Sequence, residues 1–76
     1  QEGKVSLGNK VRLFDMEFEE ELTYTIVGST EADPAEGRIS NESPVGKALL
    51  GAQEGEVVKV EAPQGEMHFK ILEISR

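Results

Sequence analysis

Glycine spacing is the feature of this sequence that most constrains its fold. Eight glycines divide the 76 residues into short segments, at Gly3, Gly8, Gly28, Gly37, Gly46, Gly51, Gly55 and Gly65. Glycine favours turns because it has no Cβ, and the runs between the glycines are typical of short β-strands. The spacing therefore predicts a turn-rich, mainly antiparallel sheet within one small domain that covers residues 1–76.

Alternation of apolar and polar residues places the strands of this sheet. In residues 21–27 every second residue is apolar, which indicates a strand with one buried face. That face holds Leu22, Tyr24 and Ile26. We expect strands at 10–14, 21–27, 38–40, 56–61 and 66–75, joined by a hairpin at 15–20, a long loop at 28–37 and a turn at 63–65. In the last strand the apolar phase changes near Ile71 and Leu72, which indicates a β-bulge there or burial of both faces.

One short helix is predicted between Ser43 and Gly51. The Ser43 hydroxyl is suited to accept a hydrogen bond from an unpaired backbone N–H, Pro44 fits the first helical position, and Gly51 fits the position after the last turn. An apolar stripe at helical spacing consists of Val45, Ala48 and Leu49. The predicted fold class is therefore α+β, a twisted antiparallel sheet of about five strands covered by one short helix.

Composition excludes several classes of function. Eight basic residues stand against fifteen acidic ones, and the net charge of −7 opposes direct binding to nucleic acid. The chain has no Cys, so disulfides, thiolate zinc sites and Cys nucleophiles are excluded. No apolar run approaches the roughly 20 residues of a membrane span, and no apolar region follows Gln1 to Lys4 as in a signal peptide. We expect a cytoplasmic protein, and the missing initiator Met suggests processing or a domain of a longer chain.

Few residues suggest catalysis. His68 alternates with Met67 and Phe69, so we expect it on the exposed face without a chemical role. An acidic hairpin could in principle bind Mg²⁺ or Ca²⁺, but alternation spreads its carboxylates over both faces, which favours a solvated surface. Its members are Asp15, Glu17, Glu19, Glu20 and Glu21. We expect no catalytic residue, metal or cofactor, and the residues alone leave open whether the capped helix only covers the sheet or also forms a docking surface.

Separated blocks of the sequence resemble the C-terminal domain of the bacterial transcript cleavage factors GreA and GreB. The blocks follow one another in the same order as in that family, at residues 5–11, 24–34, 37–40, 43–51 and 62–66. The resemblance extends from about Val5 to Ile74 and so covers nearly the whole chain.

The resemblance implies an FKBP-like α+β fold and a docking role. In this family the domain anchors the factor to RNA polymerase, at the coiled coil of the β′ subunit beside the secondary channel. A separate N-terminal helical hairpin enters that channel, and its acidic tip helps to hold Mg²⁺ while the polymerase hydrolyses backtracked RNA. No stretch of this sequence has the heptad pattern of such a hairpin. We therefore expect the N-terminal coiled-coil domain to be absent from this chain, which would dock without promoting cleavage.

The resemblance also implies partner-binding residues. The family contacts the polymerase through an acidic or polar residue followed by Ser-Pro, which corresponds here to Glu42, Ser43 and Pro44. Many members have Asp where Glu42 stands. Glu31 and Asp33, in the preceding loop, are further candidates for the same surface. We expect a monomer that binds RNA polymerase and contacts neither nucleic acid nor membrane.

Two alternative functions stay open. An anti-cleavage Gre-like regulator would share this domain and differ only in the residues before Gln1. An FKBP-like prolyl isomerase would need an aromatic cleft to desolvate the X-Pro amide, and four aromatic residues are present: Phe14, Phe18, Tyr24 and Phe69. Since alternation places Tyr24 and Phe69 in the core, the isomerase is the less favoured alternative.

Overall fold

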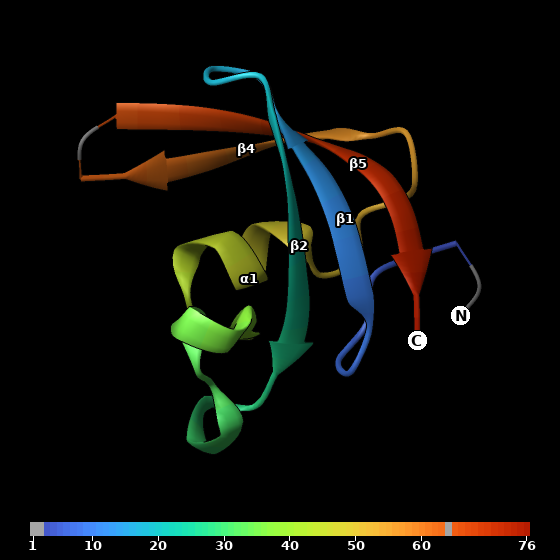
Figure 1. Cartoon of the computed structure of the whole chain (residues 1–76), viewed down its shortest axis with the longest axis vertical. Helices are drawn as coiled ribbons and strands as arrows, with labels where there is room; N and C mark the ends of the chain where they lie inside the picture. The colour runs from blue at the N-terminus through green and yellow to red at the C-terminus, as the bar shows by residue number, and fades with distance from the viewer. Residues whose placement is uncertain (1–2, 64) are drawn as a thin grey trace.

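A computed structural model describes residues 3–63 and 65–76 of the chain. One curled sheet has the strand order β3-β2-β1-β5-β4, and helix α1 lies inside its curve, packed against β4 and β3 (Figure 1). The strands are β1 (Lys10–Asp15), β2 (Glu20–Val27), β3 (Arg38–Ser40), β4 (Val57–Ala62) and β5 (Gly65–Ser75). The helix is α1 (Pro44–Leu49), and the 3-10 turns are η1 (Ser29–Glu31) and η2 (Pro34–Glu36). The expected α+β class and the five strands are confirmed. The predicted turn at 63–65 includes residue 64, which lies outside the described residues.

The sheet is mainly antiparallel, as expected, but one pair of neighbouring strands is parallel. β3 runs parallel to β2, with Thr25 opposite Arg38 and Val27 opposite Ser40. A parallel neighbour requires a connection that returns along the preceding strand. The loop from Gly28 to Gly37 provides this return through η1 and η2. Alternation predicts which residues face the core but carries no information on strand direction.

A β-bulge in β5 explains the change of apolar phase. Arg12 of β1 lies opposite Glu73, whereas the next residue, Leu13, lies opposite Ile71. Leu72 is therefore the extra residue of the bulge. Ile74 pairs with the buried Val11 and packs against the core, although it is three residues from Ile71. The bulge thus keeps both isoleucines on the core side of one strand.

The hydrophobic core lies between the concave face of the sheet and α1. Its buried apolar residues are Val5, Val11, Leu13, Ile26, Ile39, Leu49, Ala52, Val58, Val60, Phe69 and Ile71. Val45 and Ala48 of the helical stripe and Tyr24 of β2 are half-buried and pack against this cluster. The predicted core faces of the helix and of β2 are confirmed. No helix in the described ranges has the length and apolarity needed to cross a membrane.

Helix α1 begins so close to the end of β3 that no side chain fits at Gly46. This glycine is buried, and a Cβ there would overlap the carbonyl oxygen of Ser40. The same oxygen accepts hydrogen bonds from the Ser43 backbone N–H (3.0 Å) and from the Ser43 hydroxyl (2.7 Å). Gly46 and Ser43 together hold the first turn of α1 against the last residue of β3.

We predict that Gly46→Ala lowers the free energy of unfolding by about 2 kcal/mol, because the added methyl group forces α1 away from β3. Urea denaturation of the two proteins measures this difference. Gly28→Ala is the matched control, since the nearest atom to its added Cβ is Glu31 Oε1 at 3.8 Å and its φ of −70° suits any residue. The control should change stability by less than about 0.5 kcal/mol. Equal urea midpoints for Gly46→Ala and wild type would contradict the prediction.

Candidate functional site

The predicted Ser-Pro segment forms the N-terminus of α1. Ser43 has an extended backbone, and its hydroxyl accepts a hydrogen bond from the Gly46 N–H at 3.1 Å. Pro44 occupies the first helical turn, where its missing N–H leaves no unpaired donor. Pro44 and Glu42 are exposed, whereas Ser43 is half-buried. The predicted cap is confirmed, and the Ser43 hydroxyl is already used within the domain.

The Glu42 carboxylate is held in place by a closed chain of hydrogen bonds. The Ser29 hydroxyl lies 3.0 Å from Glu42 Oε1 and 3.1 Å from the Ser40 hydroxyl, which in turn accepts from the Glu42 N–H at 2.9 Å. Ser29 has one hydroxyl hydrogen and donates it to the carboxylate, so Ser40 must donate to Ser29. This series of hydrogen bonds starts and ends at Glu42, and it joins η1, β3 and the loop before α1. The carboxylate is thereby both exposed and oriented.

Glu31 and Asp33 lie near this segment in different ways. Glu31 is exposed in η1, the turn that contains Ser29 and packs against β3. Asp33 is exposed at the start of η2, and its backbone exchanges two hydrogen bonds with Arg38, at 2.8 and 3.0 Å. In the described part of the chain, no side-chain hydrogen bond joins either residue to Glu42. The structure thus groups Glu42, Ser43 and Pro44 with η1, and Asp33 stands further along the loop.

Sequence reasoning missed Ser29 and Ser40. Both are ordinary polar residues in the loop and in the short strand, and they are 13 and 2 residues from Glu42. Serine in a loop usually bonds its own neighbouring backbone. Ser40 does so, since its hydroxyl accepts from the Glu42 N–H two residues later. Ser29 comes beside the Glu42 loop only through the parallel pairing of β3 with β2, so no local pattern could have identified it.

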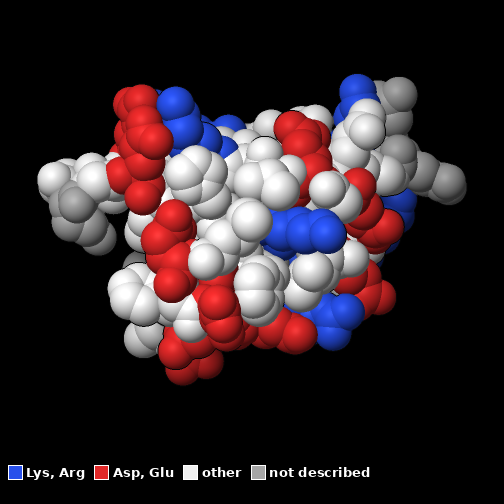
Figure 2. All heavy atoms as spheres, turned by 90° about the horizontal axis from the view of Figure 1, so that it is seen from above, with Lys and Arg blue, Asp and Glu red and all other residues white. Residues whose placement is uncertain are grey.

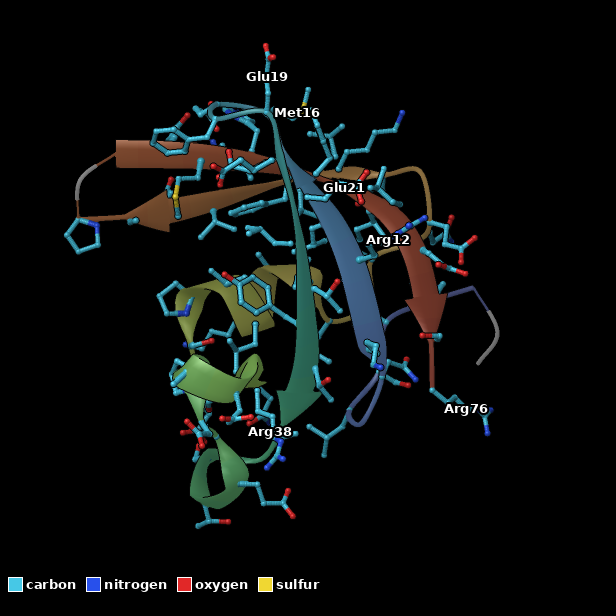
Figure 3. The ribbon with its side chains drawn as sticks, viewed as in Figure 1. Arg12, Met16, Glu19, Glu21, Arg38 and Arg76 are labelled. Carbon is cyan, nitrogen blue, oxygen red and sulfur yellow. The ribbon has the colours of Figure 1, made fainter. Side chains whose placement is uncertain are left out.

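The acidic hairpin between β1 and β2 was expected to be a solvated surface, but one of its carboxylates is buried. Asp15 is only 7 % exposed, and its Oδ1 accepts hydrogen bonds from the N–H groups of Glu17 (2.9 Å) and Phe18 (3.2 Å). The remaining carboxylates of the hairpin are exposed, and Glu19 lies at the top of the molecule near Met16 (Figure 3). Figure 2, which shows the molecule from above, has acidic side chains spread over this face. Among residues 3–63 and 65–76, no group of three or more acidic, histidine or cysteine side chains could hold a metal ion.

His68 is partly exposed, as strand alternation predicted, and its imidazole pairs with Glu17. Its side chain is 40 % exposed, and its Nδ1 lies 3.2 Å from Oε2 of Glu17. The His68 backbone N–H donates to the other oxygen of the same carboxylate at 3.0 Å, and the His68 carbonyl accepts from Met16 N–H. These hydrogen bonds favour the ionised carboxylate, the backbone bond most, and lower the pKa of Glu17 below its ordinary value of 4.5.

This clamp predicts how stability depends on pH. Because the pKa of Glu17 is lower in the folded chain, its contribution is fully present above the ordinary value of 4.5 and is lost as pH falls through the folded value. Urea unfolding at several pH values should show wild type losing more stability below pH 4.5 than Glu17→Gln does. Glu36→Gln, an exposed carboxylate in η2, is the control and should follow wild type. Parallel curves for Glu17→Gln and wild type would count against the clamp.

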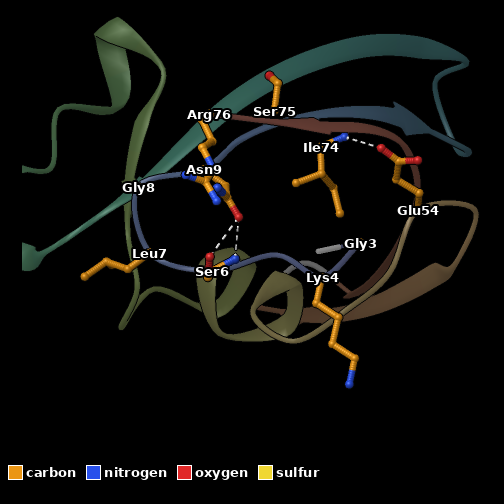
Figure 4. A pocket seen from close by; sticks show the side chains of 10 residues that line it. All are labelled: Gly3, Lys4, Ser6, Leu7, Gly8, Asn9, Glu54, Ile74, Ser75 and Arg76. Atoms are coloured by element: carbon orange, nitrogen blue, oxygen red, sulfur yellow. Dashed lines mark hydrogen bonds between the residues drawn. The ribbon is translucent and has the colours of Figure 1, made fainter. Parts of the chain in front are cut away.

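A hollow between the N-terminal loop and the end of β5 offers no cleft for a proline substrate. It encloses about 480 Å³ between the loop 3–9 and the end of β5 (Figure 4). Its lining contains no aromatic residue. Asn9 Oδ1 accepts from the Ser6 N–H and hydroxyl, and Glu54 accepts from the Ile74 N–H at 2.9 Å. Phe69 is buried and Phe18 lies on the hairpin, so the isomerase alternative finds no support in these surfaces.

Comparison with known proteins decides the family. A family model described as transcription elongation factor, GreA/GreB, C-term, matches residues 1–76. The chain belongs to this family. The resemblance seen in the separated sequence blocks of this GreA/GreB C-terminal domain is thereby confirmed.

Curated relatives of this GreA/GreB C-terminal domain are named transcription elongation factor GreA. The protein of Acetivibrio thermocellus is 61 % identical over 72 residues, and that of Clostridioides difficile is 62 % identical over 72 residues. In both cases the match covers 95 % of this chain but 45 % of the relative. The chain thus spans less than half the length of these relatives.

Solved structures of related proteins have the same fold. GreA factor homolog 1 of Thermus thermophilus superposes with a TM-score of 0.82 at 36 % identity, over 99 % of this chain and 51 % of that one. The GreA/GreB factor of Nitrosomonas europaea gives 0.81 at 28 % identity, over 100 % and 63 %. The five-stranded sheet with one short helix is therefore the fold of the GreA C-terminal domain.

Proposed function

We propose that this domain docks a Gre-type transcription elongation factor on RNA polymerase, at the coiled coil of the β′ subunit. Family membership supports a role with the polymerase, since the curated relatives are named transcription elongation factors. The observation that carries the proposal is the exposed Glu42 carboxylate, oriented by Ser29 and Ser40 beside the exposed Pro44. Glu31, and at a greater distance along the loop Asp33, would extend this acidic surface.

The roles within the docking surface follow from the hydrogen bonds. A carboxylate already held in one geometry loses little conformational freedom when it pairs with a basic side chain of the partner. Pro44 adds a rigid apolar contact at the start of α1. Ser43 acts as a positioning residue, because its hydroxyl is committed to Ser40 and Gly46.

In this proposal the 76 residues are one docking domain that works as a cytoplasmic monomer and contacts protein, not RNA. The net charge of −7 opposes approach to phosphates. The 76 residues themselves carry no heptad pattern of the coiled-coil domain that the resemblance associates with cleavage. We therefore expect these residues alone to bind the polymerase without stimulating cleavage. An anti-cleavage Gre-like regulator would dock through the same surface and remains the alternative.

We predict that Glu42→Lys weakens binding to the isolated β′ coiled coil about tenfold, because it replaces attraction to a basic partner by repulsion. Pro44→Ala should weaken binding less than Glu42→Lys does. Ser29→Ala should also weaken binding, because it releases the Glu42 carboxylate from its fixed position without removing its charge. Fluorescence anisotropy with a labelled domain measures each affinity. Since the contact lies at the protein surface, wild-type affinity should also fall as salt rises.

Glu61→Lys serves as the matched control, because it makes the same change of charge at an exposed position of β4. This variant should bind like wild type after a small correction for net charge. Equal affinities for wild type, Glu42→Lys and Pro44→Ala would refute the proposed surface.

A further inference from the structure

The hairpin between β1 and β2 projects two apolar side chains into solvent. We call residues 16–19 the hairpin knob. Phe18 is 73 % exposed and Met16 46 % exposed. The other two exposed large apolar side chains of the described residues, Leu7 at 58 % and Val57 at 46 %, belong to two different segments of the chain. The knob stands at the top of the molecule, beside β5 (Figures 1 and 3). Apolar side chains placed together at a tip are typical of an interaction surface.

The hairpin knob is held rigidly. The buried Asp15 side chain accepts from two N–H groups of the turn, and its carbonyl accepts from the Glu19 N–H at 2.7 Å. Glu17 ties the turn to β5 through the two hydrogen bonds with His68. A partner that binds Phe18 therefore does not have to order the loop, which reduces the entropic cost of association.

Charge indicates the kind of partner that fits the hairpin knob. Glu17 is paired with His68, and Glu21 lies 3.9 Å from Arg12, but Glu19 and Glu20 form no ion pair within the described residues. Both side chains are exposed, and they directly follow Phe18 in the sequence. An apolar side chain bordered by free carboxylates is complementary to an apolar socket bordered by Lys or Arg. Enzymes that hold nucleic acid present basic surfaces of this kind.

The hairpin knob and the docking surface lie at opposite ends of β2. The knob immediately precedes Glu20, and Ser29, which holds Glu42, follows Val27 after one residue. Eight extended residues span about 26 Å. Figure 3 shows Glu19 and Met16 at one end of the molecule and Arg38 of β3, the strand that ends at Ser40, near the other. The two surfaces are therefore separate patches of the domain.

We propose that the hairpin knob makes a second contact with RNA polymerase, in an apolar socket bordered by basic side chains and separate from the β′ coiled coil. This inference rests on the proposed docking function. A single contact at Glu42 would leave the domain free to turn about it. A second contact about 26 Å away fixes the angle of the domain on the polymerase, and it adds affinity because the two contacts act within one complex.

The test compares two targets, RNA polymerase core enzyme and the isolated β′ coiled coil. Phe18→Ser should weaken binding to the core enzyme about tenfold, as expected when an aromatic anchor is removed, and leave binding to the coiled coil unchanged. Glu19→Gly should weaken core binding and reduce its salt dependence, without destabilising the turn, because its φ of +56° suits glycine. Leu7→Ser, at an exposed apolar residue outside the hairpin, is the matched control and should change neither affinity.

The outcomes separate this inference from the docking proposal. If Phe18→Ser and wild type bind the core enzyme equally, or if Phe18→Ser also weakens coiled-coil binding, the second contact is overturned. If only Glu42→Lys weakens binding, to the core enzyme and to the coiled coil alike, the docking proposal stands and the second contact does not. If Phe18→Ser instead abolishes a self-association of wild type seen by analytical ultracentrifugation, the knob binds a second copy and the inference is wrong. Unchanged thermal unfolding of each variant confirms that the fold is intact.

Discussion

The carbonyl oxygen of Ser40 is the point on which the arrangement of this domain depends. It receives two hydrogen bonds from Ser43, and Gly46 packs against it with no side chain between them. These contacts join the end of the parallel strand β3 to the start of α1. Because α1 closes the core under β4, the junction determines how the helix lies against the sheet.

The same junction carries the candidate docking surface. The Ser40 backbone supports the helix, while its hydroxyl forms part of the chain of hydrogen bonds that orients Glu42. Ser40 therefore serves both the fold and the site, the first through its carbonyl oxygen and the second through its hydroxyl. Changes at Ser43 or Gly46 act mainly on the helix, whereas changes at Glu42 or Ser29 act on the exposed carboxylate. This separation makes binding measurable apart from stability.

Much of the fold follows from local patterns. Alternation identified the strand positions and the change of phase that proved to be a bulge at Leu72, and residue type identified the cap at Ser43. The direction of β3 could not be predicted, because parallel and antiparallel strands show the same alternation. Asp15 was expected in a solvated cluster, but it is buried because its side chain bonds the backbone of the turn. This burial depends on the closed hairpin and could not be predicted from residue type. Two further contacts join residues that are distant in sequence: Ser29 with Glu42 across 13 residues, and Glu17 with His68 across 51 residues.

By itself, the sequence determined the class of this protein, since glycine spacing, alternation and the Ser-Pro cap are local and act through backbone geometry and capping. Its separated blocks also determined the family. Only the tertiary structure decided which side chains meet. The parallel return of β3 brings Ser29 to Glu42, and the hairpin brings Glu17 to His68 across 51 residues. Those contacts depend on how the strands are paired in space, which no local pattern encodes.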